Sequence, residues 1–195
     1  MKIGIAALTP LLALSCSAVS GAQSQTHGNP RGAASAEPRA AIRAPLAGGV
    51  DDPVAWVRKA YDPASRQETG SSESAAAGDG GYSSTPEFSP RLRALFAEDE
   101  SYANGEVGRL DFNPFSGAQD DDIKRADVTS SDVDGAPDRK VVIAKFRNMD
   151  VNQTITFYWE RIAGRWYIDD ISGRTAGDPH GWTLSLILKF GSHEP

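Results

Sequence analysis

Three short runs of alternating apolar and polar residues, between positions 140 and 172, constrain the fold more than any other part of the chain. β-Branched and aromatic side chains recur at every second position, which is the period of a strand with one buried face. The pattern breaks at Asn148-Met149-Asp150 and at Ala163-Gly164, where tight turns are expected. The inward-facing side chains are predicted to be Val142, Ala144 and Phe146, then Ile155, Phe157 and Trp159, then Trp166 and Ile168. The stretch therefore predicts an antiparallel meander with one apolar side.

Two helical patterns precede this meander. In the first, Asp52 can cap a helix that has Pro53 at its first position and ends before Asp62-Pro63. The second begins at Ser89-Pro90 and ends at Asn104-Gly105. Its core-facing stripe is predicted to hold Leu92, Leu95, Phe96 and Tyr102, with Glu98, Asp99 and Glu100 mostly on the other face. A weak strand pattern follows from position 123 to 133, so the fold class is α+β.

The 195 residues are best divided into one domain and its flanking segments. We expect a single α+β domain from 51 to 190, with a flexible insertion at about 64–84 and a short tail at 191–195. Residues 23–50 are rich in Ala, Gly and Pro and contain almost no large apolar side chain, which is typical of a disordered tether.

The first 22 residues have the pattern of a secretory signal peptide, because a short basic start is followed by an uncharged apolar run. Cleavage after Ala22 is expected, and the alternative is a lipoprotein anchored at Cys16. Cys16 is the single cysteine, so the mature fold contains no disulfide in either case. We therefore expect an exported protein, periplasmic or secreted, with no transmembrane segment after cleavage.

Composition disfavours several functional classes. The formal net charge is −6 and the basic residues are not clustered, so nucleic acid is not expected as a partner. The sequence has no Gly-rich phosphate loop and no Gly-x-Ser-x-Gly motif. The histidines, at positions 27, 180 and 193, have no ligand-like spacing. We expect neither a cofactor nor a metal.

Three stretches of the chain carry a family resemblance. They are Ser89-Pro90-Arg91-Leu92-Arg93-Ala94-Leu95-Phe96, Leu110-Asp111-Phe112-Asn113-Pro114-Phe115 with Gln119-Asp120, and Trp166-Tyr167-Ile168-Asp169-Asp170-Ile171. Together with the order of elements, they resemble the nuclear transport factor 2-like (cystatin-like) superfamily. Within it, the chain is most similar to a family of secreted bacterial proteins of unknown function. That family usually has Asp-Pro where this chain has Asn113-Pro114, a departure that removes one carboxylate.

The resemblance implies a curved antiparallel sheet wrapped against helices to form a cone. It also bears on residues 182–190, whose alternation fits a strand and whose Leu184, Ile187 and Leu188 fit one helical face. Because the resemblance implies a C-terminal helix that closes the cone, we predict a helix from Leu184 to Lys189. The resemblance implies no reaction, since the superfamily contains enzymes, subunit partners and domains without catalytic activity.

The polar and aromatic stretch after the second helix is the candidate binding site. Phe112 and Phe115 are expected to be buried anchors. Asp111, Asn113, Gln119 and Asp120 are then expected near the opening of the cone, where they could bind a ligand. The alternative is that Asp111 and Asn113 bond their own turn and that Asp120 belongs to a solvated face.

A catalytic alternative rests on Asp170, Asp120 and Tyr158. Burial inside such a cone raises the pKa of a carboxyl group into a range useful for proton transfer. Strand alternation directs Asp170 toward the core, but a bulge would place Ile171 there and turn Asp170 outward.

These observations favour a non-catalytic exported envelope protein that binds a small ligand, a peptide or a protein partner. The first alternative is a small isomerase or hydrolase that uses a buried carboxylate. The second is a structural envelope protein with no pocket. A homodimer is compatible with each of these interpretations.

Overall fold

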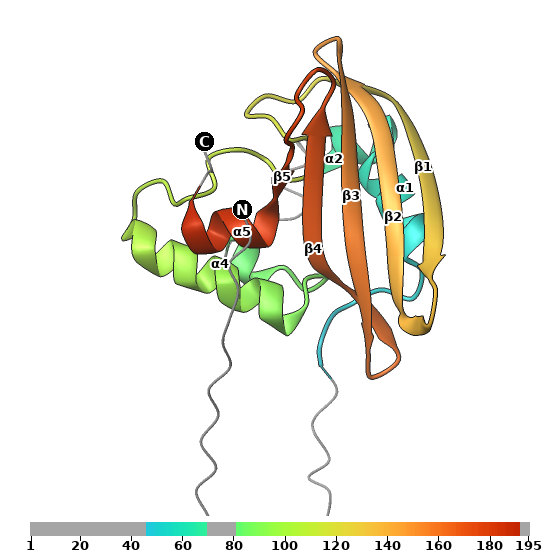
Figure 1. The fold of residues 1–195 in the computed structure, drawn as a ribbon, viewed down its shortest axis with the longest axis vertical. Helices are drawn as coiled ribbons and strands as arrows, with labels where there is room; N and C mark the ends of the chain where they lie inside the picture. The colour runs from blue at the N-terminus through green and yellow to red at the C-terminus, as the bar shows by residue number, and fades with distance from the viewer. Residues whose placement is uncertain (1–45, 70–80, 192–195) are drawn as a thin grey trace, which may run out of the picture. The chain divides into compact units, whose positions relative to one another are not determined.

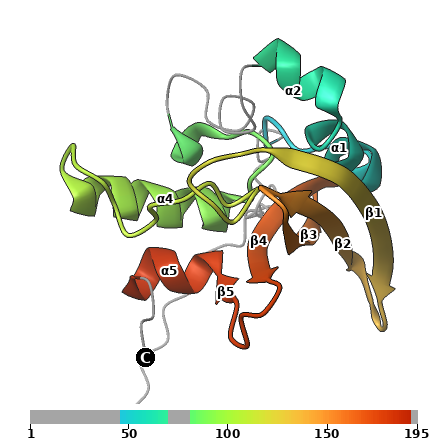
Figure 2. The same cartoon turned by 90° about the horizontal axis from the view of Figure 1, so that it is seen from above.

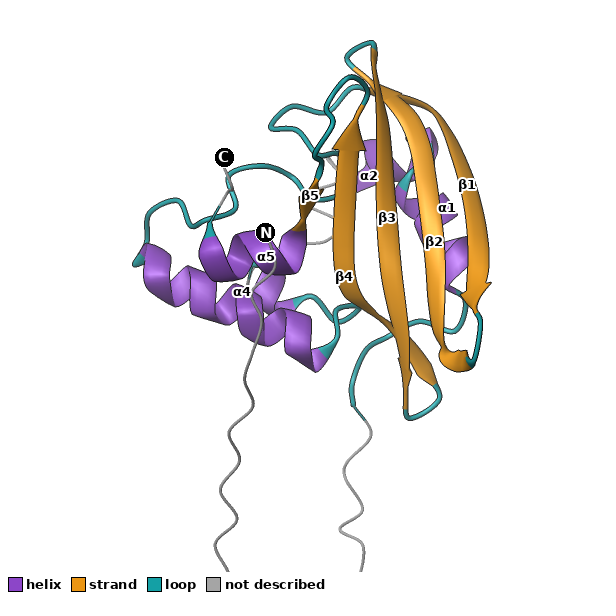
Figure 3. Cartoon of the chain, in the orientation of Figure 1, coloured by secondary structure: helices purple, strands orange, loops and turns teal. Residues whose placement is uncertain are grey.

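The computed structural model describes residues 46–69 and 81–191, and these form one unit of helices and strands (Figures 1 and 3). In chain order, the elements are α1 (Pro53–Ala60), α2 (Pro63–Thr69), the 3₁₀ turn η1 (Tyr82–Ser84), α4 (Pro90–Ala103), β1 (Ile123–Val133), β2 (Ala136–Asn148), β3 (Val151–Ile162), β4 (Arg165–Thr175), β5 (Trp182–Thr183) and α5 (Leu184–Phe190). The expected signal peptide, most of the tether, and the tail after Gly191 lie outside the described residues.

The sheet is five-stranded and antiparallel, in the order β1-β2-β3-β4-β5. Its two predicted hairpin turns have left-handed backbone, with φ of 47° and 67° at Met149 and Asp150 and of 50° and 87° at Ala163 and Gly164. These angles fit two-residue turns that match the twist of the flanking strands. The α+β class and the antiparallel meander are thus confirmed.

The sheet is curved, and the helices lie in two groups around it (Figure 2). α1 and α2 lie on the concave side, where α1 contacts β1 and β2, while α4 and α5 lie beside the β4–β5 end. α5 confirms the predicted C-terminal helix, and β5 accounts for the strand-like pattern just before it. Within the described residues, no helix is both long and apolar enough to span a bilayer.

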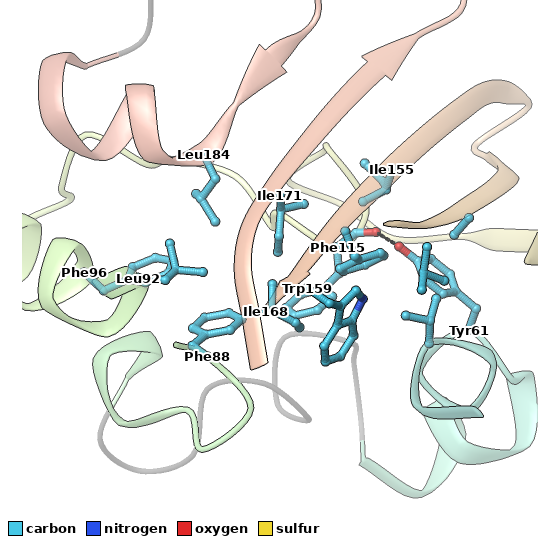
Figure 4. Packing of buried hydrophobic residues seen from close by; sticks show 14 of the residues in the cluster. Tyr61, Phe88, Leu92, Phe96, Phe115, Ile155, Trp159, Ile168, Ile171 and Leu184 are labelled. Carbon is cyan, nitrogen blue, oxygen red and sulfur yellow. Dashed lines mark hydrogen bonds between the residues drawn. The ribbon is translucent and has the colours of Figure 1, made fainter. Parts of the chain in front are cut away.

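The core lies on the concave side of the sheet and follows the predicted alternation. Val142, Ala144, Phe146, Ile155, Phe157, Trp159 and Ile168 are all buried, whereas Trp166 is only partly buried. Figure 4 shows residues of α4 and of the 110–122 segment meeting those of the sheet. Phe115 is central to this packing, with ring contacts to Phe88, Phe157 and Trp56.

A buried tyrosine links α1 to this aromatic centre. The Tyr61 hydroxyl donates a hydrogen bond of 2.5 Å to the carbonyl oxygen of Phe115, drawn as a dashed line in Figure 4. Burial, with the Asp121 charge adding to it, raises the pKa of Tyr61 well above its ordinary value of 10.0, although Arg66 acts in the opposite direction. The hydroxyl therefore stays protonated and fixes the loop that carries Phe115.

Helix α4 has the predicted caps but only part of the predicted stripe. Ser89 Oγ accepts from the backbone N–H of Leu92, and Asn104 ends the helix in the left-handed conformation. Tyr102 is 66% exposed, in contrast to the prediction, because the last turn extends past the core and the Arg109 guanidinium covers the ring at 3.9 Å.

Asp99 is buried, which corrects the expectation that it lies mostly on the outer face of α4. It follows Leu95 and Phe96 by four and three residues, so it shares their helix face. Its carboxylate accepts the backbone N–H of Arg109 at 3.0 and 3.1 Å and lies 3.4 Å from the Arg109 guanidinium. A charge at this position is tolerated because the loop after α4 supplies donors to it.

The segment expected to be a flexible insertion, at about 64–84, contains packed residues at both ends. α2 occupies part of the expected insertion, and its Arg66 lies 3.8 Å from Asp121 and donates to the carbonyl of Ile123. At the other end, the Tyr82 ring stacks on Phe96 and Phe88 at centroid distances of 5.0 and 6.3 Å. The range predicted to be a flexible insertion thus contains packed residues, because local composition does not reveal contacts made with distant segments, and its residues 70–80 lie outside the described residues.

Residues at the end of the expected tether also pack on the sheet. Val50 forms an antiparallel bridge with Trp166, and the Tyr167 hydroxyl donates to the carbonyl oxygens of Leu46 and Gly48. Phe88 bridges to Ile168 further along the same edge of β4, and β5 pairs with Ser172 and Gly173 beyond it. The free edge of β4 is thus covered by three segments, two of which are remote in sequence.

Candidate functional site

A β-bulge in β4 determines which side chains reach the outer face of the sheet. Tyr158 pairs with Asp170 and Trp159 pairs with Ile168, so Asp169 is the extra residue. Ile168 and Ile171 can therefore both enter the core, and Asp170 turns outward. This is the bulged alternative that the sequence allowed.

Asp169 anchors the start of α4. Its carboxylate accepts hydrogen bonds from Ser89 Oγ at 2.9 Å, Arg91 Nε at 3.0 Å and Arg139 Nη1 at 3.3 Å. Burial raises the pKa of the Asp169 carboxyl, but the hydrogen bonds from Arg91 and Ser89 and the charges of Arg91 and Arg139 outweigh it. The pKa therefore lies below its ordinary value of 3.8, and the group is a stable anion.

Asp170 anchors the start of α5. One oxygen accepts the backbone N–H groups of Ile171 at 2.9 Å and Ser185 at 3.0 Å, and the other accepts Ser185 Oγ at 2.5 Å. Thr183, at the N-cap of α5, makes no side-chain capping bond, so the carboxylate from β4 replaces it. With both oxygens occupied, Asp170 is placed as a structural acceptor.

Next to this anchor, the outer face of the sheet presents two rows of polar side chains. In one row, Thr156 pairs with Ser172, which pairs with Thr183 on β5. In the neighbouring row, Thr154 lies between Lys145 on β2 and Arg174 on β4. Tyr158 extends the hydroxyl surface, since its oxygen lies 3.3 Å from Ser172 Oγ.

These rows form one wall of a cleft of about 1240 Å³, named here the α5 cleft. The remaining walls are the 178–183 segment, α5 and Phe112. The apolar lining residues are Phe112, Trp182, Leu186, Ile187 and Phe190. Leu186 is 55% exposed and Phe190 is 73% exposed, and they lie four residues apart on one face of α5. The cleft therefore combines an apolar helix face with a hydroxyl-rich sheet face.

The α5 cleft is weakly basic on an acidic chain. Lys145 and Arg174 line it, and neither has a carboxylate oxygen within 4.0 Å among the described residues. Asp127, which pairs with Lys145 across β1 and β2, forms no ion pair with it. Asp178 is the lining carboxylate, and it accepts the backbone N–H of His180 at 2.9 Å.

The residues predicted to bind a ligand do not belong to this cleft. Asn113 is buried, and its side chain accepts the N–H of Phe115 at 2.9 Å and donates to Asp121 at 2.9 Å. It bonds its own turn, as the alternative interpretation held. Gln119 and Asp120 are exposed, and the Asp120 carbonyl accepts from Asn148 at 2.9 Å.

Asp111 lines a smaller cleft of about 480 Å³ beside the end of α4. The two phenylalanines of the same stretch differ, because Phe115 is 2% exposed and Phe112 is only partly buried. Phe112 packs edge-on against Trp182 at 4.9 Å, so it supports the α5 cleft instead of the core. In the part of the chain that the structure describes, no group of three or more His, Cys, Asp or Glu residues is arranged to bind a metal.

Sequence reasoning missed Lys145, Thr154, Arg174 and Trp182 as site residues. The period-2 pattern does place Lys145 and Thr154 on the outward face of their strands, whereas Arg174 reaches that face only because of the bulge in β4. An outward-facing residue is ordinarily solvated, however, and the local sequence does not reveal that α5 lies beside this part of the sheet. None of the residues that the sequence indicated for ligand binding or catalysis lines the cleft, although Tyr158 contacts the lining residue Ser172.

Comparison of the chain with protein-family models, with curated proteins and with solved structures finds no match in any of the three.

Proposed function

We propose that this is a non-catalytic binding protein and that its ligand is a small amphipathic molecule held in the α5 cleft. The observation that carries this proposal is that the exposed apolar face of α5 and a row of hydroxyl groups line one cleft. Exposed apolar side chains grouped in a concave site are typical of ligand binding. We further propose that the chain is exported and has a nuclear transport factor 2-like fold, which the two helices before the meander and the short helix after it support.

The placement of the catalytic candidates favours binding over the isomerase or hydrolase alternative. Both oxygens of Asp170 accept hydrogen bonds from α5 and from its own strand. Asp120 is exposed and lies in the loop before β1, apart from Tyr158 on β3. General acid–base catalysis requires a proton-transfer group within reach of a bound substrate, and these residues do not share one enclosed site.

The test is titration with two amphiphiles, decanoate and decyl maltoside, each below its micelle concentration. The indole N–H signal of Trp182, assigned with Trp182→Phe, reports on the cleft by NMR. We expect at least one amphiphile to shift this signal. Leu186→Glu should weaken that binding at least tenfold, because it places a charge on the apolar wall.

The matched control is Val133→Glu, which alters an exposed apolar residue at the far end of β1. It should bind as the unaltered protein does. A Trp182 signal that responds to neither amphiphile, or equal binding by the Leu186→Glu variant, would contradict the proposed function.

A further inference from the structure

We propose that Lys145, Thr154 and Arg174 form an anion-binding row, so that the ligand of the α5 cleft is an amphiphile with one carboxylate or phosphate head group. This inference rests on the proposed function and adds the chemical class of the ligand. The head group lies over the sheet row, and the apolar chain lies along α5.

The first support is register. Lys145, Thr154 and Arg174 are direct partners across β2, β3 and β4, so their side chains leave the same face of the sheet. Adjacent strands are about 4.8 Å apart, which puts the two cationic residues about 10 Å from each other at their Cα atoms. Both side chains are long and flexible enough to converge over Thr154, whose hydroxyl can donate to the same anion.

The second support is charge. Lys145 and Arg174 are exposed and have no ion-pair partner among the described residues, in contrast to Arg91 of α4 and Arg139 of β2, which both pair with Asp169. These two cations face one lining carboxylate, Asp178, in the described part of a chain with net charge −6. An anion would complete this row with charge-assisted hydrogen bonds.

The third support is the arrangement of the apolar wall. Leu186 and Phe190 line the same cleft from one face of α5, and Trp182 and Phe112 continue this wall. A purely ionic ligand would leave these side chains in water, whereas burial of a chain of methylene groups against them is favourable. The cleft therefore fits a single anionic head joined to an apolar chain.

The experiment compares the affinities of decanoate, decyl phosphate and decyl maltoside for the full chain and its variants by calorimetry. We expect Lys145→Gln and Arg174→Gln each to weaken binding of the better anionic amphiphile by roughly threefold to tenfold and to leave decyl maltoside binding unchanged. Arg58→Gln, which removes an exposed cation from α1, should change none of the affinities. The ratio of decanoate to decyl phosphate affinity identifies the head group.

The outcomes separate the two proposals. If decyl maltoside shifts the Trp182 signal but the Lys145 and Arg174 variants bind the anions unchanged, the anion row is wrong and the proposed function stands. If none of the three amphiphiles affects Trp182, both are wrong. Raising the NaCl concentration to 0.5 M should weaken the anionic amphiphiles selectively, and equal weakening of decyl maltoside would also contradict the anion row.

Discussion

Gly173 and Trp182 are partners across the β4–β5 ladder, and the Trp182 indole occupies the space that a Cβ atom at Gly173 would fill. A Cβ atom at this position would lie 2.3 Å from the nearest ring carbons, closer than real Cβ atoms approach any neighbour. Gly173 is not among the residues with positive φ, so its backbone conformation would itself accept a side chain. The glycine is therefore required by the tryptophan that lines the α5 cleft.

Gly173→Ala should displace the Trp182 ring and cost about 1–3 kcal/mol of unfolding free energy, as overpacking does. In a Trp182→Ala background, the same substitution should cost little, because the obstructing ring is gone. A double-mutant cycle measured by urea unfolding gives the coupling directly. Equal costs in the two backgrounds would show that the two residues do not compete for this space.

Asp169→Asn should reduce stability at neutral pH and make stability less dependent on pH in acid. The folded-state pKa of Asp169 lies below its ordinary value of 3.8, so the carboxylate contributes fully above that value. The contribution is lost as the pH falls through the lowered folded-state pKa. The stability difference between the two proteins should therefore be largest above about pH 5 and shrink toward about pH 2.

The control for Asp169 is Asp134→Asn, which changes an exposed carboxylate in the β1–β2 turn. Chemical unfolding across the pH range should give nearly parallel curves for this variant and the unaltered protein. A difference between Asp169→Asn and the unaltered protein that stays constant throughout the acid range would contradict the ionic role of Asp169.

Phe115→Ala should destabilise the domain by about 3–5 kcal/mol, as removal of a large core side chain does. Phe112→Ala should cost less, within the ordinary range of about 0.5–3 kcal/mol, because that ring is only partly buried. Phe112→Ala should instead weaken amphiphile binding, since the ring supports Trp182. Comparable losses of stability in the two variants would show that both rings belong to the core.

The elements with strong local patterns could be predicted from the sequence. Alternation identified the strands, and the Asp52-Pro53 and Ser89-Pro90 pairs identified two helix starts. These predictions succeed because caps, turns and one-sided burial are set by neighbouring residues. The α5 helix needed more than local information, since its residues fit a strand and a helix about equally well.

The candidate site could not be predicted in the same way, because tertiary contacts determine it. Asp169 and Asp170 are adjacent and chemically identical, yet the bulge assigns one to α4 and the other to α5. The burial of Tyr167 could not be predicted from its neighbours either, since it results from the packing of residues 46–50 over its side chain. Nothing in the local sequence distinguishes such outward-facing residues from solvated ones.

The covered edge of β4 also determines the order in which the chain can become native. Val50 and Phe88 have their sheet partners at Trp166 and Ile168, more than three quarters of the way along the chain. During synthesis, the N-terminal helices have no completed sheet to pack against until β4 has left the ribosome. The long-range pairing of Val50 and Phe88 with β4 must form before the N-terminal helices can be stabilised by packing against the sheet. The domain should therefore fold slowly and in one late step.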